Sequence, residues 1–255
     1  MTKLESNVAL ITGAGSGIGA ATARLMAQEG AKVALCGIPA EGVEQVTAEL
    51  TNTGYEAIAL PTDVSDGAQV QAAVEETVRT FGHLDILVAN AGIQLHNLDV
   101  NLHELPEEVW DRTHAVNYRG VYLTTKHGLA QMITQEEGGV VIIVASVTAF
   151  SGASPNVAYL SGKHGLLGLN RHIAVHYGKY GIRCNAVCPG ALEQTPNFDD
   201  HPDPEGRASR LTARIPLGRL GRPDDIAPFI TFLASPEASY ATGAYFLIDG
   251  GLTAG

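Results

Sequence analysis

The fold is decided by the stretch Asn7-Val8-Ala9-Leu10-Ile11-Thr12-Gly13-Ala14-Gly15-Ser16-Gly17-Ile18-Gly19. Residues 7–12 form a short apolar run that stops at Gly13, which is typical of a buried β-strand. The glycines at 13, 17 and 19 follow, and residues 20–28 are strong helix formers. The stretch therefore predicts a strand, a tight glycine turn and the start of a helix.

This arrangement forms an anion site. Backbone N–H groups and the helix dipole point at a bound phosphate, and glycine lets the ligand approach the backbone closely. The spacing is G-x-x-x-G-x-G rather than the common G-x-G-x-x-G, because position 18 is Ile. We interpret residues 13–19 as a nucleotide site rather than a plain turn, since further strand–helix units follow.

The alternation of strand and helix continues to the end of the chain. Its strands are apolar throughout, which indicates a parallel sheet covered by helices on both faces. The predicted fold class is α/β, with a Rossmann-type doubly wound parallel β-sheet in a single domain, residues 1–255. We expect the further strands at 32–36, 56–60, 84–89, 140–144, 182–187 and 245–248, and the further helices at 41–50, 69–81, 105–135 (broken near Asn117), 156–180 and 223–234.

Composition excludes several classes of protein. The net charge of −11 gives no support to nucleic-acid or anionic-membrane binding. No apolar run approaches the length of a membrane span, and residues 1–6 lead directly into the first strand with no signal-peptide core. The three cysteines, Cys36, Cys184 and Cys188, are odd in number and lie in apolar, strand-like stretches, which disfavours a disulfide framework or a four-ligand zinc site. We expect a soluble, cytoplasmic protein without a metal site.

A second chemical signal is Tyr159-x-x-x-Lys163. On a helix, residues four apart project from one face, so the phenol and the ammonium are neighbours. A free phenol has a pKa of about 10, and a nearby positive charge lowers it towards the working range of an acid or base. The alternative is a ring at the edge of the core beside a solvated lysine.

Ligands of parallel α/β sheets bind beyond the carboxyl ends of the strands. The residues that directly follow the predicted strands should therefore line one crevice. These residues are Gly13 to Gly19, Gly37, Asp63, Asn90, Ser146 and Pro189.

Eight motifs that occur in order along the chain carry a family resemblance: Thr12-Gly13-x-x-x-Gly17-Ile18-Gly19, Asp63-Val64, Asn90-Ala91-Gly92, Asn117, Ser146, Tyr159-x-x-x-Lys163, Pro189-Gly190 and Asp249-Gly250-Gly251. With these motifs the chain resembles the short-chain dehydrogenase/reductase family over nearly its whole length. The resemblance implies an NAD(P)-dependent oxidoreductase that transfers hydride between nicotinamide and a ketone or secondary alcohol.

The resemblance also implies a role for each catalytic residue. Tyr159 is the acid or base, and Ser146 hydrogen-bonds the substrate oxygen. Lys163 lowers the pKa of Tyr159 and holds the nicotinamide ribose, while Asn117 holds a water that links Lys163 to solvent. The alternatives are a buried cap for Ser146 and a helix-break residue for Asn117. His96 and Val147 are further substrate candidates, although a solvated loop position also suits His96.

For the coenzyme, the resemblance implies an adenine contact at Asp63, a position near the adenosine ribose for Asn90, and a nicotinamide border at Pro189-Gly190. Asp63 alone would be interpreted as a turn residue or helix cap. Gly37 is not the acid that grips ribose hydroxyls in NAD-dependent members. The full coenzyme set is Gly13, Ser16, Gly17, Ile18, Gly19, Gly37, Asp63, Val64, Asn90, Ala91, Gly92, Tyr159, Lys163, Pro189, Gly190 and Thr195.

The coenzyme is NAD or NADP. Ser16 and Ile38 stand where NADP-dependent members carry a basic residue, and a 2′-phosphate needs charge compensation. We therefore favour NAD. The family's usual Thr four residues after Gly190 is Gln194 here, with Thr195 one place later, and this leaves the carboxamide contact open.

Residues 191–217 are polar and rich in helix breakers, which is typical of a mobile substrate lid. We expect a small-molecule substrate and, from the resemblance, a homotetramer. Two alternatives stay open, a 3-oxoacyl-carrier-protein reductase and a non-catalytic nucleotide-binding regulator. The acidic charge of the chain disfavours the first, because the carrier protein is also acidic. The presence of Ser146, Tyr159 and Lys163 disfavours the second.

Overall fold

The computed structural model describes residues 2–254. Its centre is a seven-stranded sheet in the order β3-β2-β1-β4-β5-β6-β7, with every pair of neighbouring strands parallel. The predicted α/β class and parallel sheet are thus confirmed. The strands are β1 (Val8–Thr12), β2 (Lys32–Gly37), β3 (Ala57–Pro61), β4 (Ile86–Ala89), β5 (Gly139–Val144), β6 (Ile182–Pro189) and β7 (Tyr245–Ile248).

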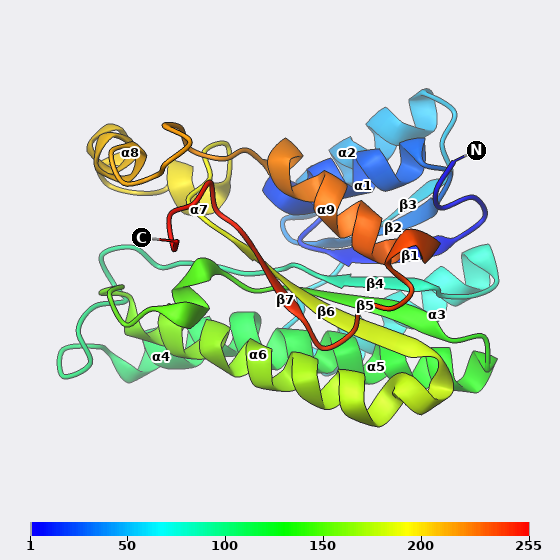
Figure 1. Cartoon of the computed structure of the whole chain (residues 1–255). Coiled ribbons are helices and arrows are strands. Elements are labelled where there is room, and N and C mark those ends of the chain that lie inside the picture. The colour runs from blue at the N-terminus through cyan, green and yellow to red at the C-terminus, as the bar shows by residue number, and fades with distance from the viewer. Residues whose placement is uncertain (1, 255) are drawn as a thin grey trace.

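Helices cover both faces of the sheet (Figure 1). Successive residues of β1 point to opposite faces, so Ala9 and Ile11 belong to the apolar cluster that includes Met26 of α1, whereas Leu10 belongs to the cluster that includes Met132 of α5. α1, α2 and α9 cover one face, and α3, α5 and α6 cover the other. The helices are α1 (Gly17–Gln28), α2 (Ala40–Asn52), α3 (Gly67–Phe81), α4 (Glu107–His114), α5 (Val121–Gln135), α6 (Val157–Tyr177), α7 (Pro196–Asp199), α8 (Pro204–Thr212) and α9 (Pro223–Ala234).

The expected break near Asn117 is wrong in detail. α4 passes into α5 through a π-helical turn, Ala115–Gly120, so the chain stays helical where a break was expected. A π turn absorbs an extra residue without ending the helix. The close approach to the neighbouring loop explains the glycine at its end, because a Cβ on Gly120 would lie 2.8 Å from Cγ2 of Val64.

The segment between β6 and α9 contains the two short helices α7 and α8, which sequence periodicity did not predict. Both lie at one end of the molecule, beside the C-terminal residues (Figure 1). The two ends of this segment are joined by backbone hydrogen bonds, from Gly221 N to Ala191 O (3.0 Å) and from Glu193 N to Gly221 O (2.9 Å).

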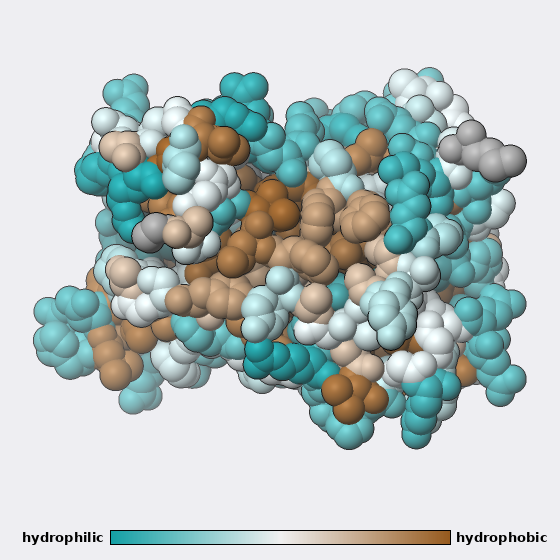
Figure 2. Space-filling view, in the orientation of Figure 1, coloured by the Kyte–Doolittle hydropathy of each residue, from teal (hydrophilic) through white to brown (hydrophobic). Residues whose placement is uncertain are grey.

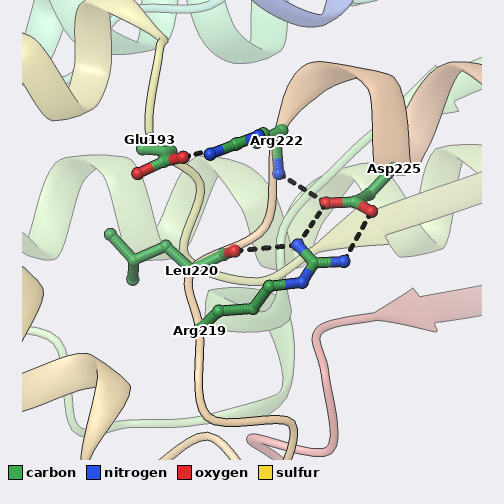
Figure 3. A network of polar contacts seen from close by, with 5 residues as sticks. All are labelled: Glu193, Arg219, Leu220, Arg222 and Asp225. Carbon is green, nitrogen blue, oxygen red and sulfur yellow. Dashed lines mark hydrogen bonds and ion pairs between the residues drawn. The ribbon is translucent and has the colours of Figure 1, made fainter.

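Side chains reinforce this junction (Figure 3). Arg222 Nε donates to Glu193 Oε1 at 2.6 Å, and Arg219 forms a two-bond ion pair with Asp225 at 2.7 and 2.8 Å. Asp225 also accepts from Arg222 N at 2.7 Å. We call residues 191–193 and 219–225 the clasp, since they hold the ends of the intervening segment together.

The sequence also predicts that no segment spans a membrane and that the cysteines form no disulfide framework. Within residues 2–254, no helix combines the length and the apolar character needed to cross a membrane. Cys36, Cys184 and Cys188 are all buried with free thiols.

Candidate active site

The glycine turn has the backbone of an anion cradle. Gly13 and Gly17 have backbone φ angles of +65° and +50°, and residues other than glycine adopt such angles only with strain. No side chain caps the start of α1, whereas Asp66 caps α3 through Ala68 N and Gln69 N. The first N–H groups of α1 are thus left to an outside acceptor, and this fits the phosphates of a dinucleotide.

The turn is held against the loop after β4. Thr12 Oγ1 accepts from Asn90 N (3.0 Å) and Ala91 N (3.1 Å), and Asn90 Nδ2 donates to Thr12 O (2.9 Å) and Gly13 O (3.2 Å). The space is so tight that a Cβ on Gly19 would lie 2.2 Å from Gly13 O. The Asn90 side-chain amide therefore holds the backbone of the glycine turn in place. The expected contact of Asn90 with the adenosine ribose stays a prediction.

The other coenzyme candidates lie at the carboxyl ends of their strands. Asp63 Oδ1 accepts from Ser65 N (2.9 Å) and Ser65 Oγ (2.7 Å), which is the local turn considered as its alternative role. Gly37 ends β2, and the side chain of Ile38 is 66% exposed. Beyond β6, a Cβ on Gly190 would lie 2.7 Å from Asp249 Cα, so glycine is required for this close approach.

Three of the four predicted catalytic side chains are buried together beyond β5 and at the start of α6. Ser146 and Tyr159 are each 8% exposed and Lys163 is 4% exposed. Lys163 Nζ lies 5.6 Å from the centroid of the Tyr159 ring. A Cβ on Gly92 would lie 3.6 Å from Lys163 Nζ, so the loop after β4 reaches the same point.

Burial dominates the titration of this group. It raises the pKa of Tyr159, while the neighbouring Ser146 hydroxyl and the positive charge of Arg207 act to lower it. The hydrogen bonds of Ser146 Oγ within 3.5 Å both join Thr148, at 3.0 and 3.1 Å, so this serine also caps the short helix Val147–Phe150. The substrate candidate Val147 is half-buried in this helix.

Lys163 is buried and hydrogen-bonded to the end of β5. Its Nζ donates to Val144 O at 2.9 Å, and burial lowers its pKa from 10.5 to about 8. The groups that lower the pKa of Tyr159 are Ser146 and Arg207, and Lys163 is not among them. The expected tuning of Tyr159 by Lys163 therefore stays a prediction for the loaded site.

Asn117 lies in the π-helical turn and is fully buried. Its Oδ1 accepts from Ile93 N and its Nδ2 donates to Ile93 O, both at 2.7 Å. These two hydrogen bonds join the Asn117 amide to both backbone groups of Ile93, as neighbouring β-strands are joined, and they fix the loop that follows Gly92. Asn117 and Lys163 are both next to Gly92, since a Cβ there would lie 3.3 Å from Asn117 Oδ1 and 3.6 Å from Lys163 Nζ.

Comparison with known proteins identifies the family of the chain. The model of a family described as Enoyl-(Acyl carrier protein) reductase matches residues 13–253. L-rhamnose 1-dehydrogenase (NAD(P)(+)) of Sphingomonas sp. (strain SKA58) is 41% identical over 99% of this chain and 98% of its own. The chain belongs to the short-chain dehydrogenase/reductase family.

Other members of the short-chain dehydrogenase/reductase family are similar over the same length. The 3-oxoacyl-[acyl-carrier-protein] reductase of Thermotoga maritima is 40% identical over 98% of this chain and 99% of its own. The solved structure of levodione reductase is 37% identical, covers 98% of this chain and 99% of its own, and has a TM-score of 0.93.

Asp99 is a site residue that sequence reasoning missed. It lies in the loop after β4, is 1% exposed, and accepts from Ala158 N and Tyr159 N, both at 2.9 Å. It therefore caps α6 and orients the turn that carries the phenol. No local pattern marks it, because its partners lie about sixty residues further along the chain.

The segment between β6 and α9 contributes Thr195 and Arg207. A Cβ on Gly17 would lie 3.4 Å from Thr195 Cγ2, so Thr195 borders the glycine turn. The preceding Gln194 has a φ angle of +58°, which turns the chain here. The substrate candidate His96 contacts this segment through a 2.6 Å hydrogen bond to Asn197 O.

Proposed function

We propose that this short-chain dehydrogenase/reductase is an NAD(P)-dependent oxidoreductase that interconverts a secondary alcohol and a ketone. The observation that carries the proposal is the burial of Tyr159 beside Ser146 and Lys163. The loop after β4 joins this group to the uncapped glycine turn, because its Asn90 hydrogen-bonds Gly13 O and its Gly92 lies next to Lys163. When bound, the nicotinamide would donate or accept the hydride. The protein must then hold the substrate oxygen and move one proton.

In the reducing direction, the Tyr159 hydroxyl donates its proton to the substrate oxygen, and the Ser146 hydroxyl stabilises the charge that develops there. In the oxidising direction, Tyr159 starts as the phenolate, accepts the proton of the alcohol and becomes the phenol. The ammonium of Lys163, 5.6 Å from the centroid of the ring, stabilises the phenolate form that this direction requires. Asn117 keeps the loop after Gly92 aligned with this group.

An activity screen tests the proposal. Purified protein is assayed with NAD(H) and NADP(H) against ketones and secondary alcohols, together with the variant Tyr159→Phe. We expect the variant to lose roughly 10²- to 10⁴-fold in kcat, the usual contribution of a positioned acid or base, while coenzyme binding is retained. Tyr177→Phe at the other end of α6 is the matched control. Full activity in Tyr159→Phe, or coenzyme binding without turnover of any carbonyl, would contradict the proposal.

Coenzyme preference follows from the end of β2. We propose that NAD is preferred, because the residues there, Gly37 and Ile38, include no cation to neutralise a 2′-phosphate. The same screen tests this through the ratio of kcat/KM for the two coenzymes. A preference for NADP would contradict it.

A second candidate function is reduction of a 3-oxoacyl group on acyl carrier protein. The 40% identity to a reductase of that kind supports it. The exposed acids Asp199, Asp200 and Glu205 oppose it, since they would face an acidic carrier. Turnover of a carrier-bound ketoacyl group with a lower KM than that of the free thioester analogue would favour this candidate.

We further propose that residues 191–217 act as a substrate lid in this one domain and that the protein is cytoplasmic.

We also propose that the protein assembles as a homotetramer. Apolar residues gather in the middle of the face that carries β7 and α9 (Figure 2). There Tyr245 and Leu247 on the edge strand are 39% and 42% exposed. Burial of this area in a subunit interface would cover the open sheet edge. Light scattering that gives the mass of a monomer would contradict the assembly.

A further inference from the structure

Arg207 lies on α8, in the segment between β6 and α9. It is half-buried, its Nη1 donates to Asn197 O at 3.2 Å, and its guanidinium carbon lies 5.6 Å from the centroid of the Phe198 ring. These contacts fix the guanidinium between α7 and α8. The side chain is therefore held in place inside the segment rather than extended into solvent.

Arg207 has no acidic partner among residues 2–254, and its Nε and Nη2 make no hydrogen bond within them. Arg210, three residues later, pairs with Asp203 at 3.2 Å. Arg183, which is also half-buried, donates to three carbonyl groups through both Nη atoms. Burial of an unpaired cation is costly, and it lowers the pKa of Arg207. An anion that binds its free edge would remove this cost.

The positive charge of Arg207 acts to lower the pKa of the catalytic phenol of Tyr159. His96 is next to it but adds no second charge. Because a carbonyl only accepts, the 2.6 Å contact with Asn197 O makes Nε2 of His96 a donor, and burial lowers the pKa of this ring. Arg207 and His96 therefore donate to the same carbonyl, and Asp200 and His201 are the other titratable neighbours of His96.

Arg207 lies beside the loop that follows β4. Its Nη1 is 3.4 Å from Nε2 of His96, and Asp99 of the same loop accepts from Tyr159 N at 2.9 Å. The residues of its own segment that border the glycine turn are Thr195 and Pro196, next to Gly17. The guanidinium is thus placed beside the substrate candidate His96, and the anion that it binds should belong to the substrate.

We propose that Arg207 is a specificity-determining residue that binds a carboxylate of the substrate, so that the enzyme acts on oxo acids and hydroxy acids. This inference rests on the proposed oxidoreductase function and narrows its substrate class. A carboxylate matches the planar fork of the free Nε–Nη2 edge and accepts two parallel hydrogen bonds from it.

The test compares each of several linear and cyclic keto acids with its own methyl ester. We expect the wild type to favour the acid by roughly 10- to 100-fold in kcat/KM, the range of a charge-assisted bidentate pair. Arg207→Gln should collapse the ratio of acid to ester towards one, and Arg207→Lys should restore part of it. Arg210→Gln, on the exposed side of the same helix, is the control and should leave the ratio unchanged.

Two results would overturn the inference. One is a wild type that does not distinguish any acid from its ester. The other is an Arg207→Gln variant that loses acid and ester turnover equally, since Arg207 would then act through the fold or through Tyr159 alone. If no ketone is turned over, the proposed function fails by itself. Thermal shifts of the coenzyme-loaded protein with keto acids then decide the inference, which requires a stabilisation that Arg207→Gln abolishes.

Discussion

Replacement of Lys163 by Met should make the coenzyme-free protein more stable while it removes the activity. Burial lowers the pKa of Lys163 from 10.5 to about 8. By linkage this shift corresponds to about 3 kcal/mol of lost stability at pH 7, because the folded chain must hold the ammonium in an apolar site. Met has a similar shape and no charge, but it loses the hydrogen bond to Val144 O, which is worth about 1 kcal/mol. We expect a net gain of about 2 kcal/mol.

The stability difference between Lys163→Met and the wild type should depend on pH. The unfolded chain keeps the proton up to pH 10.5 and the folded chain only up to about 8, so the wild type gains stability as the pH rises between these values. At pH 10 the unfolding free energy that the wild type loses through the buried Lys163 falls below about 1 kcal/mol. The gain in unfolding free energy from Lys163→Met should then nearly vanish.

Urea-induced unfolding, followed by the fluorescence of Trp110, measures both variants at pH 7 and pH 10. Lys126→Met, at an exposed position on α5, is the control and should gain nothing at either pH. A Lys163→Met protein that is less stable than the wild type at pH 7 would refute the reasoning. A stability difference that is the same at both pH values would refute it as well.

Three further substitutions probe the frame of the site. Asp99→Ala leaves two buried N–H groups at Ala158 and Tyr159 without an acceptor, so urea unfolding should show a loss of about 2–5 kcal/mol and kcat should fall; unchanged stability would contradict the capping role. Gly19→Ala would bring a Cβ to 2.2 Å from a backbone oxygen and should abolish coenzyme binding, measured by quenching of NADH fluorescence, whereas normal binding would show that the turn yields. Gly168→Ala in α6 meets nothing within 4 Å and should raise the unfolding free energy by about 0.5–1 kcal/mol, and a loss would reveal a contact on that face.

The sheet and its helices could be predicted from sequence because their signals are local. β7 and α9 have the predicted bounds, since a proline begins α9 and an apolar run of four residues ends at Asp249. Most other strands and helices differ from the prediction by one to three residues at an end, where hydrogen bonding rather than hydropathy decides the boundary. The glycine turn was also a local signal.

The supporting residues of the site could not be predicted in this way. Asp99 acts on a helix about sixty residues away, and Arg207 lies on a helix of nine residues in which no residue is fully buried. Asn117 in the π turn hydrogen-bonds Ile93, a tertiary contact that the local sequence does not show. Burial decides the state of Lys163, and a sequence gives the neighbours of a lysine along the chain but not the depth at which it lies.

The clasp has a consequence for how such enzymes diversify. Because residues 191–193 and 219–225 are joined, the chain between them leaves and re-enters the domain at a single point. Insertions or deletions between residues 194 and 218 can therefore change the length of the segment while β6 and α9 keep their places. Such changes would act first on the two contacts that the segment makes with the rest of the site, Thr195 beside Gly17 and Arg207 beside His96.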